Sequence, residues 1–275
     1  MPTRPRLPLR LAAAVLAAAA CSSTPAPRAA PDPQDALPAN ARIAYLHHST
    51  GAVVWASGVP EAIQAWNASS GKSYAITELT YPSTTLGYPW ENYPYDYWNL
   101  WVSHQGTDRE LGELNLDDLV ASYDVIVWKH CFPVSAIGPD GASPSVSSPE
   151  KTLANYRLQY EALKARMRQF PAKRFVVWTG AALVEAATDL ASAERAQQFF
   201  AWVKGTWDEP GDNVYVWDFQ QLETGGGPYL LPENAASATD SHPNATFAAA
   251  VAPLAARRIV DVIEGRGVIA SLTGE

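Results

Sequence analysis

The chain of 275 residues has little of several features that define whole classes of protein. It has only two cysteines, Cys21 and Cys131, which excludes a disulfide-stapled scaffold, and no Cys/His spacing typical of a structural zinc site. Basic residues are the minority, 20 against 28 acidic ones, and the net charge of −8 argues against nucleic acids as partners. No internal repeat and no central linker divides the chain. With 47% hydrophobic residues, it can form one large domain with a substantial core.

The apolar run at the N-terminus is too short to cross a bilayer. Residues 1–10 carry three arginines and no acid, and residues 11–20, LAAAVLAAAA, are all apolar. A transmembrane helix needs about twenty such residues. A basic segment followed by a short apolar one is instead typical of an export signal. We therefore predict a signal peptide over residues 1–20.

Small residues directly before Cys21 make the end of this segment resemble a bacterial lipoprotein cleavage site, with Cys21 as the lipidated residue. An ordinary signal-peptidase site beside an incidental cysteine is the alternative. Lipidation implies an exported protein held in the cell envelope by a lipid anchor. Ser22 is compatible with the outer membrane of a Gram-negative cell, facing the periplasm or the cell surface. Residues 21–40 are rich in Pro, Ala and Ser without a hydrophobic period, which predicts a disordered tether.

Short β-branched or aromatic runs alternate with helical patterns through the remaining residues, 41–275. The predicted strands are residues 42–46, 74–79, 124–128, 174–179 and 213–219. The predicted helices lie around 59–68, 116–122, 149–170, 196–207 and 247–263, the third with Ser148 as its N-cap and Pro149 as its first residue. This alternation predicts a doubly wound α/β/α sandwich with a five-stranded parallel sheet, in which ligands bind at the carboxyl ends of the strands.

The motif DSHPN stands directly before the last predicted helix. In an extended segment, residues two apart project to the same side, so Asp240 and His242 can face one way. The carboxylate can then orient the imidazole, which can act as general base toward a serine. Ser49, in HHSTG, follows the first predicted strand on a tight turn whose backbone N–H groups can stabilise an oxyanion. The alternatives are a turn serine and a turn histidine beside a helix cap at Asn244.

These residues resemble the SGNH (GDSL-type) hydrolase superfamily, over essentially all of residues 42–275. That family places its serine after the first strand and an Asp–His pair before the C-terminal helix, positions that Ser49, Asp240 and His242 match. The resemblance implies a flavodoxin-like sheet and ester hydrolysis by a Ser-His-Asp triad, with no metal and no cofactor. The usual spacing in the family is Asp-x-x-His, whereas here Thr239 stands at that carboxylate position. A shorter Asp-x-His pair also occurs in related polysaccharide-acetylating enzymes.

The third predicted strand is followed by WKHCFP instead of the family's Gly-x-Asn-Asp, whose Asn donates to the oxyanion. The candidates for oxyanion stabilisation or for supporting the triad are Gly87, Lys129 and His130. Two other chemistries remain open. Cys131 and His130 can form a nucleophile pair, and His47, His48 and His242 can hold zinc.

Residues 81–101, YPSTTLGYPWENYPYDYWNLW, form an unusually aromatic connection after the second predicted strand. Long connections at sheet edges often form binding surfaces, and aromatic rings suit the C–H faces of sugars. The rings predicted to line a substrate cleft are Trp90, Tyr93, Tyr95, Tyr97, Trp98 and Trp101. The alternative is that they pack as a hydrophobic cluster against the sheet.

The sequence thus predicts a serine esterase acting on carboxyl esters, in particular acetyl esters of a cell-envelope or extracellular carbohydrate. Its predicted partners are an acylated carbohydrate or small ester and the membrane that holds the lipid anchor. Two alternatives remain. A polysaccharide O-acyltransferase uses the same triad with a sugar hydroxyl in place of water, and a non-catalytic lipoprotein of the same fold only binds glycans.

Overall fold

The computed structural model describes residues 1–2 and 34–275, so Cys21 and most of the predicted signal and tether lie outside the described residues. The strands are β1 (Arg42–His47), β2 (Ala75–Thr80), β3 (Val125–Trp128), β4 (Arg174–Trp178) and β5 (Val214–Trp217). They form a parallel sheet in the order β2-β1-β3-β4-β5. This confirms the predicted five-stranded parallel sheet, and the order is that of flavodoxin-like doubly wound folds.

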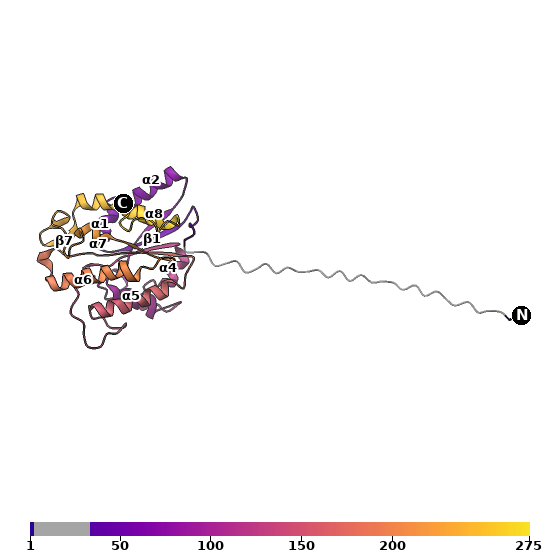
Figure 1. Ribbon diagram of the computed structural model, residues 1–275, viewed down its shortest axis with the longest axis horizontal. Coiled ribbons are helices and arrows are strands. Elements are labelled where there is room, and N and C mark those ends of the chain that lie inside the picture. Colours follow the sequence, from indigo (N-terminus) through magenta and orange to yellow (C-terminus); the bar gives the residue numbers. More distant parts are fainter. Residues whose placement is uncertain (3–33) are drawn as a thin grey trace.

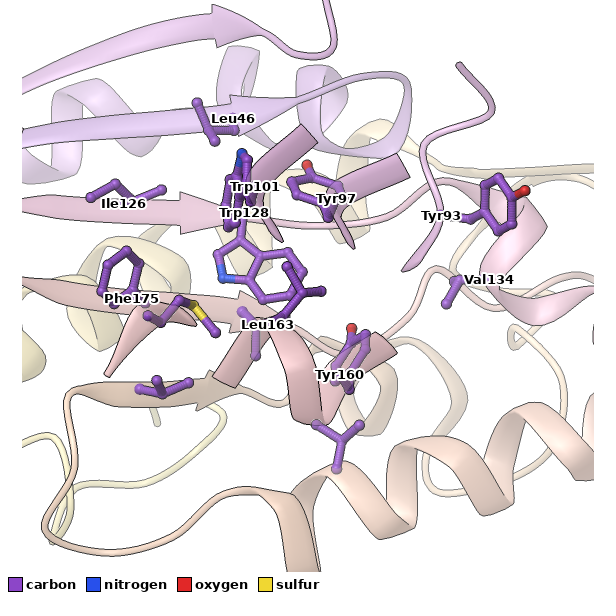
Figure 2. Close-up of a cluster of buried hydrophobic side chains, with 14 of the residues drawn as sticks. Leu46, Tyr93, Tyr97, Trp101, Ile126, Trp128, Val134, Tyr160, Leu163 and Phe175 are labelled. Atoms are coloured by element: carbon purple, nitrogen blue, oxygen red, sulfur yellow. The ribbon is translucent and has the colours of Figure 1, made fainter. Parts of the chain in front are cut away.

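Helices cover both faces of the sheet (Figure 1). One face carries α1 (Thr50–Ala56), α2 (Val59–Ser70) and α8 (Ala245–Ile263), and the other carries α4 (Leu116–Ser122), α5 (Leu153–Met167) and α6 (Leu190–Trp202). Alternate residues of β1 divide between two cores, as the period of a strand requires. Ile43 and Tyr45 pack with the first set of helices, whereas Ala44 and Leu46 pack with the second. The second core is rich in large rings around Trp128 (Figure 2).

The other elements are short. They are α3 (Pro94–Trp98), α7 (Phe219–Thr224), the strands β6 (Ala235–Ser237) and β7 (Asp240–Pro243), two π-helical turns η1 (Asn99–Ser103) and η5 (Val203–Trp207), and three 3₁₀ turns η2 (Glu110–Gly112), η3 (Phe132–Ser135) and η4 (Glu185–Ala187). β6 and β7 pair antiparallel as a hairpin between α7 and α8. None of the helices among residues 34–275 combines the length and apolarity needed to cross a membrane.

Two predicted boundaries are corrected. Helix α5 begins after Thr152, whose side chain accepts a hydrogen bond from Asn155 N at 3.3 Å, so Ser148 is not its N-cap. Ser148 lies in a loop that folds back onto the helix, and its carbonyl accepts from Gln159 Nε2 at 2.8 Å. The last residues of the predicted tether also contact the domain, because Leu37 N donates to Ile263 O at 2.7 Å. The predicted cap of the last helix is present, with Asn244 Oδ1 accepting from Phe247 N at 2.9 Å.

Candidate active site

Ser49 lies in the two-residue connection between β1 and α1, at the carboxyl edge of the sheet. Its backbone has φ 50° and ψ −114°, a conformation that residues with a Cβ rarely adopt. Such strain costs on the order of 1–3 kcal/mol and persists where the surrounding structure enforces it. The turn directs the hydroxyl toward β7, where Ser49 Oγ lies 2.5 Å from His242 Nε2.

The opposite nitrogen of the imidazole contacts Asp240. His242 Nδ1 is 2.6 Å from Asp240 Oδ1, and the same oxygen accepts from the backbone His242 N at 3.0 Å. These two hydrogen bonds, backbone first, lower the pKa of the Asp240 carboxyl. Thr239, at the family's usual carboxylate position, donates its backbone N–H to Ser237 Oγ at 3.3 Å. The carboxylate on His242 is therefore that of Asp240, because both residues lie on the same side of β7.

The outer end of this row of side chains is open to solvent. The Asp240 side chain is 51% exposed and the His242 side chain 38% exposed. The ring of Phe132, from the first turn after β3, packs edge-on against the imidazole with 5.1 Å between ring centroids. The imidazole is thus fixed by three contacts, with Ser49, Asp240 and Phe132, while water can still reach it.

Lys129 supports the serine turn from beneath. Its side chain is buried, and Nζ donates to His48 O at 2.9 Å and to Cys131 Sγ at 3.6 Å. No carboxylate oxygen of the described residues lies within 4.0 Å of this ammonium. Burial lowers the pKa of Lys129, and the nearby Cys131 and Glu223 oppose that effect. The Lys129 amine therefore lies under the carbonyl that precedes Ser49 without a carboxylate among the described residues in close contact.

Backbone donors for an oxyanion are available at the start of α1. The amides of Gly51 and Ala52 bond to His48 O and Ser49 O, whereas the Thr50 amide has no acceptor among the described residues. By contrast, Gly87 is exposed, and nothing lies within 4 Å of the position that its Cβ would occupy. The oxyanion role considered for Gly87 therefore has no contact to support it.

His130 does not belong to this site. Its side chain is fully buried, its Nε2 pairs with Tyr160 OH at 2.9 Å, and it packs edge-on against Tyr97 and Trp128. The His130 side chain points into the core beneath α5. The predicted role of His130 beside Ser49, in supporting the triad or stabilising the oxyanion, is therefore wrong. His130 is also turned away from Cys131, whose sulfur instead accepts from Lys129.

The aromatic connection is mainly structural. Tyr93, Tyr97 and Trp101 are 5%, 0% and 0% exposed and belong to the core, which corrects their assignment to a cleft (Figure 2). Tyr97 and Trp101 lie one helical turn apart on α3 and η1, so they share the face that packs on Trp128. Their polar atoms form hydrogen bonds within the core. Tyr97 OH donates to Lys129 O, and Trp101 Nε1 donates to Tyr81 OH.

The remaining three rings are partly exposed. Tyr95 and Trp98 pack on each other, with 5.6 Å between ring centroids. Trp90 stacks on His48, with 3.8 Å between ring centroids, and is the ring of this set placed beside the Ser49 turn.

The two histidines before Ser49 have separate partners. His47 Nε2 lies 2.9 Å from Glu78 Oε1, and His48 Nε2 lies 2.6 Å from Pro82 O. Burial, followed by the charge of Lys129, lowers the pKa of His47 to about 4, and burial also lowers the pKa of His48. Within residues 34–275, no group of three His, Cys, Asp or Glu side chains is placed to hold a metal ion.

Comparison with known proteins gives little further information. No family model matches the chain, and no curated protein matches it. Among solved structures, the chain is similar to one described as a gut microbial diltiazem-metabolizing enzyme, at 10% identity and a TM-score of 0.45. The match covers 82% of this chain and 47% of that chain.

Proposed function

We propose that the protein is a serine esterase of the SGNH type, with Ser49 as nucleophile, His242 as general acid and base, and Asp240 as the carboxylate that orients His242. One observation carries this proposal. The row of hydrogen bonds from Ser49 Oγ through both imidazole nitrogens to Asp240 Oδ1 is unbroken, with links of 2.5 and 2.6 Å. Nucleophile, base and orienting carboxylate in this order are the arrangement that activates a serine.

In the proposed reaction, His242 Nε2 takes the proton of Ser49 Oγ as that oxygen attacks the acyl carbon of an ester. Asp240 keeps Nδ1 protonated and stabilises the imidazolium that forms. Nε2 then gives the proton to the departing alcohol, which leaves an acyl group on Ser49. Water, activated by the same nitrogen, releases the acid and restores the serine.

Two groups near Ser49 favour the negative charge of the tetrahedral intermediate. The Thr50 amide, which has no acceptor among the described residues, begins α1 directly after the nucleophile, and the buried Lys129 amino group lies under the turn. Preorganised donors of this kind supply a large part of the catalysis in acyl transfer.

The exposure of the site favours hydrolysis over its alternatives. Transfer to a sugar hydroxyl requires water to be kept out, whereas the Asp240 and His242 side chains are 51% and 38% exposed. A non-catalytic binding protein has no need of a strained serine in a hydrogen-bonded row. Burial of Tyr93, Tyr97 and Trp101 removes most of the reason to expect a carbohydrate ester.

The test is hydrolysis of phenyl acetate by the full-length chain in mild detergent. Ser49→Ala and His242→Ala should each lower kcat/KM by about three orders of magnitude, and the double variant should lose little more, because the residues act as one unit. Asp240→Asn should cost about two orders of magnitude or more, because an amide can stabilise the wrong imidazole tautomer. An active Ser49→Ala enzyme would refute the proposal.

A further inference from the structure

A groove of about 550 Å³ lies apart from the Ser49 site, behind the β6–β7 hairpin. It is formed mainly by residues 184–186 of the connection after β4 and residues 227–232 of the connection after α7, with Ala238 at the tip of the hairpin. No residue that lines it belongs to the Ser49 site. Its volume is within the range of ligand pockets, roughly 300–1,000 Å³. We therefore consider it as a binding site of its own.

The interior of the groove is apolar. Its floor is a small hydrophobic cluster that is separate from the two cores beside the sheet and consists of the buried residues Ala182, Val184, Leu230 and Ala235. The walls add apolar side chains that solvent reaches, those of Tyr229, Leu231, Pro232 and Ala238. A ligand that covers these side chains removes their apolar surface from water, so the groove favours a ligand with an apolar body.

Much of the backbone that lines the groove has no hydrogen-bond donor to offer a ligand. Val184, Leu230 and Leu231 each donate their backbone N–H to an acceptor within the protein, at 2.9–3.0 Å. Residues 228 and 232 are prolines, which have no backbone N–H. A carboxylate or phosphate that entered the groove would find few donors to replace the water that it loses, and such burial is unfavourable.

The charged groups at the rim of the groove are carboxylates. Glu185 lines the groove, and Asp189 and Glu194 lie near the Tyr229 phenol, whose pKa is raised by burial and then by these three carboxylates. No Lys, Arg or His nitrogen of the described residues lies within 4.0 Å of any of the three. Carboxylates accept hydrogen bonds and attract cations, so the rim complements a positively charged donor and repels an anion.

We propose that this groove is a binding site for an amphiphilic cation, a small molecule with an apolar body and a protonated amine. The apolar body covers the floor and the walls of the groove. The ammonium lies at the rim, where it donates to Glu185 and contacts the face of the Tyr229 ring. This binding goes beyond the proposed esterase, because neither the groove nor its ligand takes part in the reaction at Ser49.

Three compounds that share a biphenyl body and differ in the charge of the head group test the assignment: biphenyl-4-ylmethylammonium, biphenyl-4-ylmethanol and biphenyl-4-carboxylate. Titration calorimetry on the full-length chain in mild detergent, corrected by a titration into detergent alone, gives a Kd for each. At low salt the ammonium should bind about tenfold or more tightly than the carboxylate, with the alcohol between them. Ser49→Ala should bind all three as the unchanged protein does, because the groove is separate from the nucleophile.

Four variants locate the binding. Ala238→Trp fills the groove and should weaken the binding of the ammonium about tenfold or more. Ala236→Trp, at an exposed position of the same hairpin outside the groove, is its control and should leave the Kd unchanged. Glu185→Gln should weaken the ammonium several-fold and leave the alcohol unchanged. Glu233→Gln, which alters an exposed acid outside the groove, should change neither Kd.

Equal Kd values for the ammonium and the carboxylate, or an ammonium Kd that Ala238→Trp leaves unchanged, would overturn the assignment. Analytical ultracentrifugation that shows a dimer of the unchanged protein and a monomer of Ala238→Trp would also overturn it, because a second copy of the chain would then occupy the groove. Selective binding of the ammonium without any Ser49-dependent ester hydrolysis would support the groove and refute only the esterase.

Discussion

At the scale of single residues, Ser49 has a backbone conformation that only glycine adopts without strain. Its φ of 50° and ψ of −114° bring the Cβ into conflict with the backbone. We predict that Ser49→Gly is more stable than Ser49→Ala by about 1 kcal/mol, because both lose the hydroxyl but only glycine relieves the strain. Urea unfolding of the two variants measures the difference.

Thr50→Gly against Thr50→Ala is the control, since Thr50 is the first residue of α1 and has no positive φ. There glycine should be the less stable of the two. Equal or lower stability of Ser49→Gly relative to Ser49→Ala would contradict strain at the nucleophile.

Lys129 is a positioning residue in this account, because it contacts the carbonyl before Ser49. Lys129→Met keeps the apolar stem and removes both the charge and the hydrogen bond to His48 O. We predict a loss of about tenfold or more in kcat with little change in KM, because the serine turn loses its support and its positive potential. Steady-state kinetics on phenyl acetate measure this split.

If the Lys129 side chain serves only for packing, kcat should be unchanged in Lys129→Met. If Lys129→Met keeps kcat within twofold while circular dichroism shows an unchanged fold, Lys129 only packs against Gly51. That contact is close, since a Cβ on Gly51 would lie 2.8 Å from Lys129 Cδ.

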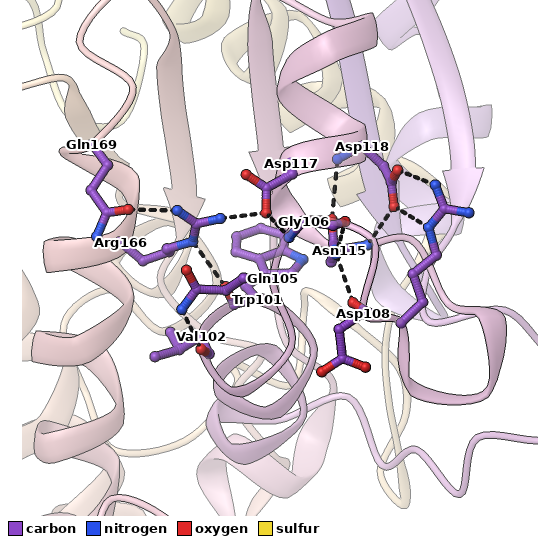
Figure 3. Close-up of polar contacts among 11 residues, drawn as sticks. Trp101, Val102, Gln105, Gly106, Asp108, Asn115, Asp117, Asp118, Arg166 and Gln169 are labelled. Atoms are coloured by element: carbon purple, nitrogen blue, oxygen red, sulfur yellow. Dashed lines mark hydrogen bonds and ion pairs between the residues drawn. The ribbon is translucent and has the colours of Figure 1, made fainter.

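At the scale of elements, a polar network holds the connection between η1 and α4 to helix α5 (Figure 3). Asp117 Oδ2 accepts from Arg166 at 2.5 Å and from Gly106 N at 2.7 Å, while Asn115 Nδ2 donates to Gly106 O and Asp108 O. Burial opposes ionisation of Asp117, but the bonds from Gly106 and Arg166 outweigh it and lower its pKa. Ionised Asp117 therefore stabilises the fold.

The contribution of Asp117 to stability depends on pH. The pKa of Asp117 is lower in the folded state than in the unfolded state. Its contribution to the free energy of unfolding is therefore fully present above about pH 4 and is lost as the pH falls through the pKa of the folded state. We predict that Asp117→Asn lowers the free energy of unfolding by about 1–2 kcal/mol at pH 7 and by less at pH 3. Urea titrations at both values measure it.

The control is Asp108→Asn, which changes an exposed acid in the same connection whose carboxylate has no bonding partner among the described residues. It should leave stability unchanged at both pH values. An Asp117→Asn deficit that is the same at pH 3 and pH 7 would contradict the role of its charge.

The elements also show how far the sequence alone was informative. Each predicted strand is present within two residues at either end. Strands β1, β3, β4 and β5 are buried, and buried parallel strands are short, nearly continuous apolar runs, whereas β2 is a largely exposed edge strand. Helix α1 was missed, since seven residues after a strained serine carry no periodic stripe. The start of α5 was misplaced because Ser148-Pro149 has the chemistry of a helix start, but the loop folds back through Gln159.

Part of the candidate site could be predicted from the sequence, and part could not. The alternation of β7 was sufficient to place Asp240 and His242 on one side, because that argument is local. The sequence WKHCFP does not determine the roles of Lys129 and His130. Neighbouring residues of an extended segment point to opposite faces, and the sequence does not show which of the two side chains faces Ser49. Lys129 faces the serine turn and His130 the ring core beneath α5. The position of the aromatic rings in residues 81–101 was ambiguous for a different reason. Rings that line a cleft and rings that pack in a core give a segment the same amino-acid composition.

At the scale of the whole molecule, the chain enters the domain at the edge of the sheet opposite the site. β1 runs from Arg42, beside the entry contact of Leu37 with Ile263, to the turn that holds Ser49.

We predict that the mature protein begins at an acylated Cys21. Intact-mass spectrometry of protein expressed in a Gram-negative host should show several added acyl chains, because one chain anchors only marginally. Cys21→Ser should abolish the added mass and leave the activity on soluble esters unchanged. An unmodified N-terminus beyond residue 21 in the unaltered protein would contradict lipidation.

Covalent trapping is the most direct test of Ser49 as the nucleophile. A fluorophosphonate reacts with a serine only where a base activates it, and the bond that it forms is stable to mass spectrometry. We expect a single adduct, mapped to the peptide that contains Ser49. This adduct should be absent in Ser49→Ala, and its formation should be strongly slowed in His242→Ala. An adduct on another residue, or aryl acetate hydrolysis that persists once Ser49 is fully modified, would contradict it.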